Sequence, residues 1–186
     1  MRFASYATVV LSFFGAAVAL PPGRRASVSD LVTDVKNVVN QIQSTFYAID
    51  SELGPDGHQM TPTELTDLLN KGGRIFSIAA ADAETITTLS EADAQTIFSN
   101  LQNASGNLAL SIYVFNHQKD FLLGGGGGSA ADRPIVFQSL QSFVNGFTAF
   151  GNSFVAIAPA DLQGSVGTFF QQFAPGLAQM LVYWSQ

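Results

Sequence analysis

Apolar residues recur at intervals of three and four along nearly the whole chain from residue 27 onward, which is the period of an α-helix. The pattern is clearest in residues 27–53, where Leu31, Val35, Val38 and Ile42 share one face and polar residues occupy the other. Alternation with the period of two that a half-buried strand shows is almost absent. Amphipathic helices bury their apolar stripes by packing against one another, so the sequence predicts an all-α fold.

Turn and capping residues divide this pattern into five helices. The first begins after Ser27 or Ser29, either of which can cap it, and ends at the turn Gly54–Gly57. Thr61–Glu64 has the form of a capping box with proline at the first helical position, and Ser90 opens the third helix. Short connections between such helices favour an antiparallel five-helix bundle. The helices are expected at roughly residues 27–53, 61–78, 90–122, 132–157 and 161–184.

Glycine and proline predict interruptions at three places. Gly72 and Gly73 lie inside the second helix, where each lowers helix stability by about 1 kcal/mol, so a bend or break is expected there. Pro175 removes a backbone donor inside the fifth helix and is expected to kink it. The five glycines Gly124–Gly128 predict a flexible connector. They do not form a phosphate-binding loop, because no strand precedes them and no lysine follows.

The composition excludes several classes of function. The chain contains no cysteine, which rules out disulfides, zinc–thiolate sites and thiol catalysis. Charged residues are 12% of the chain, against 47% apolar residues, and the formal net charge is −6. With no basic run in the sequence, binding to nucleic acid or electrostatic docking on anionic membranes has no support.

Residues 1–19 have the form of a secretory signal peptide. A single positive charge at Arg2 precedes the apolar stretch Ala7–Leu20, which contains the small-x-small cleavage pattern Ala17–Ala19. The alternative is a membrane anchor, but about fourteen residues of helix rise only about 21 Å, less than the ~30 Å hydrocarbon core. We therefore expect a secreted, extracellular protein without an integral membrane span.

The mature chain is expected to have two parts. Residues 20–26 are an extended linker or a short propeptide, because the dibasic pair Arg24–Arg25 is either a second processing site or a solvated segment. Residues 27–186 form the helical bundle, which is long enough to bury its own core.

Catalytic and metal-binding motifs are missing. The two histidines, His58 and His117, do not fall in a metalloprotease pattern, and no nucleophile elbow occurs. Asp50, Glu52 and Asp56 lie near His58 around the first interhelical loop, and oxygen ligands at such spacing can hold calcium. They do not match the EF-hand loop, so an ordinary polar turn is favoured. The sequence therefore predicts no catalytic residue, no metal and no cofactor.

Two further polar features have simple interpretations. Asp82, Glu84, Glu91 and Asp93 suggest acid–base chemistry only if they are shielded from water, and a solvated turn is the favoured alternative. Asn103 begins the sole N-glycosylation sequon, which is usable in a secreted protein if this side chain faces solvent.

Phenylalanine is unusually abundant, with sixteen residues in the chain and eight of them in the last two helices. The rings either fill an ordinary core or line an apolar cavity between the helices. Small neighbours at Gly146, Gly151, Gly164 and Gly167 either fill the remaining space or leave room. The residues expected to line such a cavity are Phe46, Phe76, Phe115, Phe147, Phe150, Phe154, Phe169, Phe173 and Leu177.

Three segments resemble the fungal hydrophobic surface-binding protein A family, which includes the Mp1p-like cell-wall galactomannoproteins. They are Asp30–Val35 in the first helix, Leu89–Asp93 before the third, and Ala158–Leu162 before the last. The resemblance implies a secreted helical bundle that is associated with the fungal cell wall and adsorbs to hydrophobic surfaces. Some members of the family bind fatty acids in a central cavity, so the resemblance also implies this property as an expectation here. The run Gly124–Gly128 and the high phenylalanine content depart from the family pattern.

The resemblance implies two alternative functions, neither of them catalytic. The first is binding of fatty acids or other lipids within the bundle. The second is adsorption to hydrophobic surfaces, with recruitment of a secreted hydrolase. Because the chain lacks the Ser/Thr-rich tail and hydrophobic C-terminal segment of a glycolipid-anchored wall protein, release or loose wall association is expected.

Overall fold

The computed structural model describes residues 26–53, 61–117 and 131–186, and for residues 45–53 and 117 it describes the backbone alone. The described residues form helices and no strand, so the predicted all-α class is confirmed. The helices are α2 (Val28–Leu53), α3 (Pro62–Glu84), α4 (Glu91–His117), α6 (Asp132–Ile157), α7 (Ala160–Gln171) and α8 (Ala174–Trp184).

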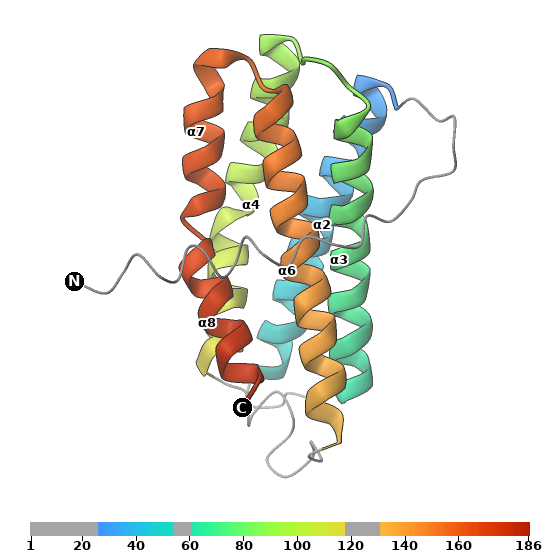
Figure 1. Cartoon of the computed structure of the whole chain (residues 1–186). Coiled ribbons are helices and arrows are strands. Elements are labelled where there is room, and N and C mark those ends of the chain that lie inside the picture. Colours follow the sequence, from blue (N-terminus) through green and yellow to red (C-terminus); the bar gives the residue numbers. More distant parts are fainter. Residues whose placement is uncertain (1–25, 54–60, 118–130) are drawn as a thin grey trace, which may run out of the picture.

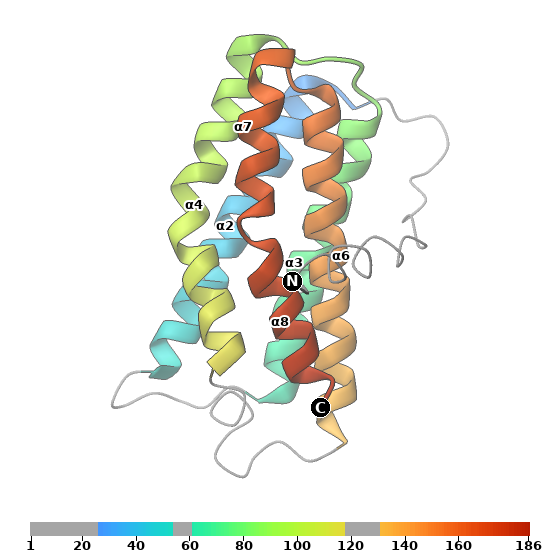
Figure 2. The same ribbon diagram turned by 60° about the vertical axis from the view of Figure 1, so that its left-hand side comes forward.

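The helices lie along a common long axis, and successive helices reverse direction from α2 to α7 (Figure 1). Helix α8 continues from the lower end of α7, so the two together form the fifth rod of the bundle (Figure 2). The predicted antiparallel five-helix bundle is therefore confirmed, with its fifth helix divided in two. Pro175 lies in the first turn of α8, where its missing N–H is not needed for the helix. Pro175 was expected to kink a single fifth helix. Instead it lies at the start of a separate helix, α8.

The predicted caps form at the first three helices. Thr61 accepts a hydrogen bond from the backbone N–H of Glu64, while the Glu64 carboxylate accepts one from the N–H of Thr61, which completes the capping box. The Ser27 hydroxyl accepts from the N–H of Asp30 at 3.2 Å, and the Ser90 hydroxyl accepts from the N–H of Asp93 at 3.1 Å. These contacts satisfy backbone donors that a helix leaves unpaired in its first turn.

Helices α3 and α6 run in the same direction and make the most extensive contact in the bundle (Figure 1). A Cβ atom on Gly73 would lie 2.9 Å from the carbonyl oxygen of Ser142, and one on Gly72 would lie 2.9 Å from the Phe143 ring. The expected break at these glycines does not occur, because α3 is continuous from Pro62 to Glu84. Close contact with α6 offsets the low helix propensity of glycine.

Helix α8 is tied to the last turn of α4. The indole N–H of Trp184 donates to the carbonyl oxygen of Phe115 at 2.9 Å, and the Asn116 amide donates to the carbonyl oxygen of Gly176 at 3.0 Å. The first bond satisfies a carbonyl at the C-terminal end of α4, which has no partner within its own helix. The short last helix is thus held by directed hydrogen bonds as well as by apolar packing.

Several predictions concern parts of the chain outside the described residues. These are the signal peptide at 1–19, the dibasic pair Arg24–Arg25, the connector Gly124–Gly128 and the side chains of the acidic loop residues near His58. Among the helices that the structure does describe, none has the length and apolar character needed to cross a membrane.

Candidate ligand-binding cavity

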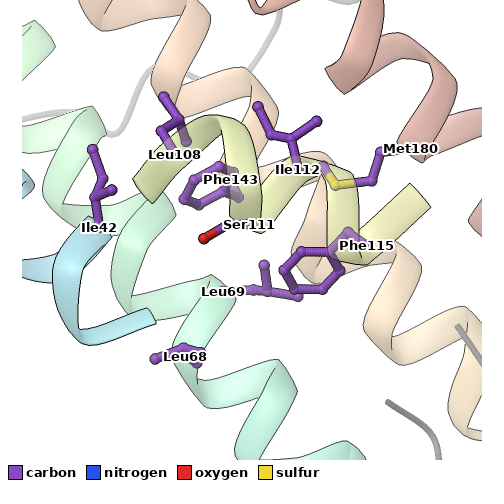
Figure 3. Close-up of a pocket in the computed structure, with 9 residues that line it drawn as sticks. All are labelled: Ile42, Leu68, Leu69, Leu108, Ser111, Ile112, Phe115, Phe143 and Met180. Carbon is purple, nitrogen blue, oxygen red and sulfur yellow. The ribbon is translucent and has the colours of Figure 1, made fainter. Parts of the chain in front are cut away.

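An apolar cavity lies inside the bundle, between α2, α3, α4, α6 and α8 (Figure 3). Its volume is about 20 Å³, which is room for about one water molecule. Its walls carry no charged side chain. The residues that line it are Ile42, Leu68, Leu69, Leu108, Ser111, Ile112, Phe115, Phe143 and Met180.

Helix α4 contributes the largest share of the wall. Leu108, Ser111, Ile112 and Phe115 follow one another at steps of three, one and three, which places them on one face of the helix. Met180 of α8 reaches the same space in Figure 3. Its unbranched thioether side chain can change rotamer more readily than a branched one, so this part of the wall is adaptable.

Ser111 supplies the polar side chain of the cavity wall. It is buried, and its hydroxyl donates to the carbonyl oxygen of Asn107 at 2.8 Å. A hydroxyl carries one donor and two acceptor positions, so Ser111 can still accept a hydrogen bond from a group in the cavity or redirect its proton to one. An otherwise apolar cavity with one hydroxyl suits a ligand that is mostly hydrocarbon.

The nine residues predicted to line a cavity have five different outcomes. Phe115 lines the cavity, and Phe76 packs edge to face on Phe143, a residue of the wall, with ring centroids 5.5 Å apart. Leu177 is buried in α8 outside this cavity. Phe46 is among the residues whose side chains are outside the described part of the chain. The remaining five, Phe147, Phe150, Phe154, Phe169 and Phe173, belong to a packed group of rings between α6 and α7.

We call this group, together with Phe170, the aromatic seam. Phe147 and Phe150 both lie against Phe170, at centroid distances of 5.2 and 5.8 Å, and Phe150 stacks on Phe154 at 6.0 Å. A Cβ on Gly151 would lie 2.8 Å from the Phe170 ring, so this glycine gives the ring its space. Edge-to-face and offset contacts of this kind are the favoured packing of aromatic rings. The seam is filled by its own rings, and its use as a cavity stays a prediction.

Eight of the nine wall residues were missed by sequence reasoning. The helical period shows that Leu108, Ile112 and Phe115 share a face, but it does not show which partners this face meets. Ile42 and Met180 come from opposite ends of the chain, and their meeting depends on the register of helices that are far apart in sequence. The abundance of phenylalanine led to the prediction of a cavity at the aromatic seam, whereas the cavity wall consists mainly of aliphatic side chains.

Of the acidic residues interpreted as a solvated turn, Glu84 and Glu91 are exposed, but Asp82 is 2% exposed. That interpretation is wrong for Asp82, because it lies on the same face of α3 as the buried residues Ala79 and Phe76. Its Oδ2 atom makes no hydrogen bond with the described residues. Within the described ranges, His, Asp and Glu side chains form no group of three that could hold a metal ion.

The described fold and cavity define a class: an all-helical bundle with a small apolar chamber between its helices. Two solved structures share this fold. One is AfMp4p in complex with palmitic acid, with a TM-score of 0.68 and 14% identity over 85% of this chain and 99% of that one. The other is ligand-binding domain 1 of the Penicillium marneffei MP1 protein complexed with arachidonic acids, with a TM-score of 0.65 and 16% identity over 88% of this chain and 100% of that one.

No protein-family model and no curated protein sequence matches this chain. The two structural matches therefore show a common fold at low sequence identity. They agree with the helical bundle of Mp1p-like proteins that the sequence resemblance implies.

Proposed function

We propose that this protein binds a long-chain fatty acid, or a lipid with a similar acyl chain, in the cavity between α2, α3, α4, α6 and α8, and that it is not an enzyme. The observation that carries the proposal is the internal wall of aliphatic and aromatic side chains with Ser111 as its polar member. The complexes of the two structures with the same fold, one with palmitic acid and one with arachidonic acids, support it.

Binding requires the cavity to expand, because about 20 Å³ does not accommodate an acyl chain. Met180 and the partly buried Leu68 can move without breaking a hydrogen bond of their own side chains. Burial of hydrocarbon supplies about 0.8 kcal/mol per methylene, so a sixteen-carbon chain contributes on the order of 12 kcal/mol before the costs of binding. Part of this free energy offsets the cost of rearranging the side chains and helices around the ligand.

The same proposal includes secretion, with release or loose association at the cell wall, as the sequence of residues 1–19 and the family resemblance indicate. The alternative function, adsorption to hydrophobic surfaces with recruitment of a hydrolase, requires a large exposed apolar patch. The large apolar side chains exposed in the described part of the chain are Leu110, Tyr113, Ile135 and Val182, spread over three helices. The apolar cavity inside the bundle is therefore the better support, and it favours lipid binding.

The test compares two leucines of α4. Leu108 lines the cavity, whereas Leu101 lies two turns away on the same face, equally buried and outside the cavity. Leu108→Phe and Leu101→Phe should each lower the free energy of unfolding by about 1–3 kcal/mol through overpacking. Only Leu108→Phe should also weaken binding of palmitate, measured by calorimetric titration of the delipidated protein. Equal affinities in the two variants, or no binding by the unmodified protein, would contradict the proposal.

A further inference from the structure

Helices α4, α7 and α8 carry almost no charge. No Asp, Glu, Lys or Arg occurs between Asp93 and His117, or after Asp161 in the last two helices. The charges that remain lie in the first turns of α4 and α7. Helices at a protein surface normally place charged residues toward solvent. These three instead expose amides, hydroxyls and a few apolar side chains.

A groove runs between α4 and α7 on this uncharged face, with a volume of about 560 Å³. Its floor is formed by the buried residues Phe98 and Phe169, whose rings meet edge to face with centroids 5.7 Å apart. Its sides are polar, with Gln102 on α4 and Ser165 and Gln172 on α7. Apolar residues normally occupy such positions between two packed helices and close the space between them. Here the positions are polar, so the groove between α4 and α7 is open to solvent.

The polar groups along the groove are free to bind a ligand. The side chains of Gln102, Ser165 and Gln172 make no hydrogen bond with other described residues, and all three are exposed. The hydroxyl of Thr168 donates to the Gly164 carbonyl at 2.9 Å, which leaves its lone pairs to accept. A Cβ on Gly164 would meet no atom within 4 Å, so a ligand can approach the backbone of α7 there.

We propose that the α4–α7 groove binds a neutral polysaccharide chain. A sugar ring has an apolar C–H face, which can contact the small part of Phe98 and Phe169, 6% and 8% of each residue, that is exposed at the floor. It also has hydroxyl groups that both donate and accept hydrogen bonds. Glutamine amides also do both, so Gln102 and Gln172 match such hydroxyls without any charge. A nucleic acid or an acidic polysaccharide would require cationic side chains, which these helices lack. The groove shares no wall residue with the lipid cavity, so this binding is a separate property.

The test uses two glycines that both have free space around the Cβ position. Gly164 lines the groove, whereas Gly106 of α4 lies outside it, and leucine at either site meets no neighbour at its Cβ. The probes are neutral hexasaccharides of β-1,3-linked glucose, of N-acetylglucosamine and of mannose, with hexagalacturonate as the anionic control. Binding is measured by calorimetric titration and by chemical-shift changes in the purified protein.

At least one neutral hexasaccharide should bind and hexagalacturonate should not. Gly164→Leu should weaken this binding at least tenfold, and Gly106→Leu should leave it unchanged. Palmitate affinity should stay the same in both variants, which separates this site from the lipid cavity. The proposal is overturned if no neutral hexasaccharide binds, or if Gly164→Leu binds as well as Gly106→Leu. It is also overturned if Gly164→Leu reduces adsorption to phosphatidylcholine vesicles while no sugar binds, since the groove would then be a lipid-surface contact.

Discussion

The carbonyl oxygen of Gly73 on α3 lies 2.5 Å from the point that a Cβ atom on Gly146 of α6 would occupy. The backbones of the two helices therefore meet directly at this position, with no side chain between them. Their contact brings Phe76 of α3 against Phe147 of α6, with ring centroids 5.3 Å apart. The pair of glycines thus sets the spacing of the two helices that carry much of the aromatic core.

Gly146→Ala should lower the free energy of unfolding by about 3 kcal/mol, because the new methyl group meets a backbone oxygen that cannot move without displacing α3. Gly106→Ala is the control, since no atom lies within 4 Å of its Cβ position. That variant should be more stable by roughly 0.5–1 kcal/mol, because alanine favours the helix. Urea unfolding of both variants measures the difference. Similar stability of the two variants would show that α3 and α6 are not in close contact.

Phe150→Trp distinguishes a filled aromatic seam from a lipid cavity at the same place. Phe150 is fully buried and contacts Phe76, Phe154 and Phe170, so the larger indole should lower stability by about 1–3 kcal/mol. Its palmitate affinity should equal that of the unmodified protein, because the proposed cavity lies elsewhere. Thermal unfolding and calorimetric titration measure the two quantities. Weaker binding with an intact fold would instead place the ligand in the seam, as the sequence alone predicts.

Binding of palmitate should change the fluorescence of Trp184, the single tryptophan of the chain. Its ring lies 6.1 Å from that of Phe115, which lines the cavity, so movement of Phe115 alters the environment of the indole. The emission spectrum should shift with palmitate concentration and saturate at one ligand per chain. In Leu108→Phe the same titration should produce little change at matched concentrations. A saturating calorimetric signal without any change in emission would indicate a site away from Phe115.

Asn103 should carry an N-linked glycan when the protein passes through a eukaryotic secretory pathway. Its side chain is exposed on α4, so the sequon that it begins with Ser105 faces solvent in the folded protein. Peptide N-glycosidase should reduce the mass of the unmodified protein and leave Asn103→Gln unchanged. The prediction fails if the secreted protein has its unglycosylated mass before enzyme treatment.

The secreted protein should begin after Ala19 or further along the chain. The apolar stretch that ends near Ala17–Ala19 is the basis for this expectation. N-terminal sequencing of material from the culture medium measures the position, and it also shows whether Arg24–Arg25 is a second cleavage site. Secreted protein that still begins at Met1 would contradict the signal-peptide assignment.

The helices and their caps could be predicted because the signals are local. A capping box needs only the four residues Thr61–Glu64, and an apolar stripe is visible in any window of three turns. The behaviour of Gly72 and Gly73 is different, since their low helix propensity is offset by α6, more than sixty residues further along the chain. Propensity alone therefore predicted a possible break that tertiary packing prevents.

The cavity was harder to predict than the fold. Phe115 was expected to line it, but Ser111, Leu108 and Met180 were not, because their positions depend on the relative register of five helices. Sequence periodicity assigns a residue to a helix face and does not place two faces in contact. Abundant phenylalanine indicated a large apolar interior, and the structure shows that most of these rings pack on one another.

The cavity wall also constrains the order in which the protein can be completed. It joins Ile42 on α2 to Met180 on α8, so the wall cannot close before α8 has been synthesised. Until α8 emerges from the ribosome and Trp184 reaches Phe115, the apolar faces of the earlier helices remain open to water or to a chaperone. The binding site is therefore complete only after α8 has packed against α4, and the helices before it cannot form the whole wall by themselves.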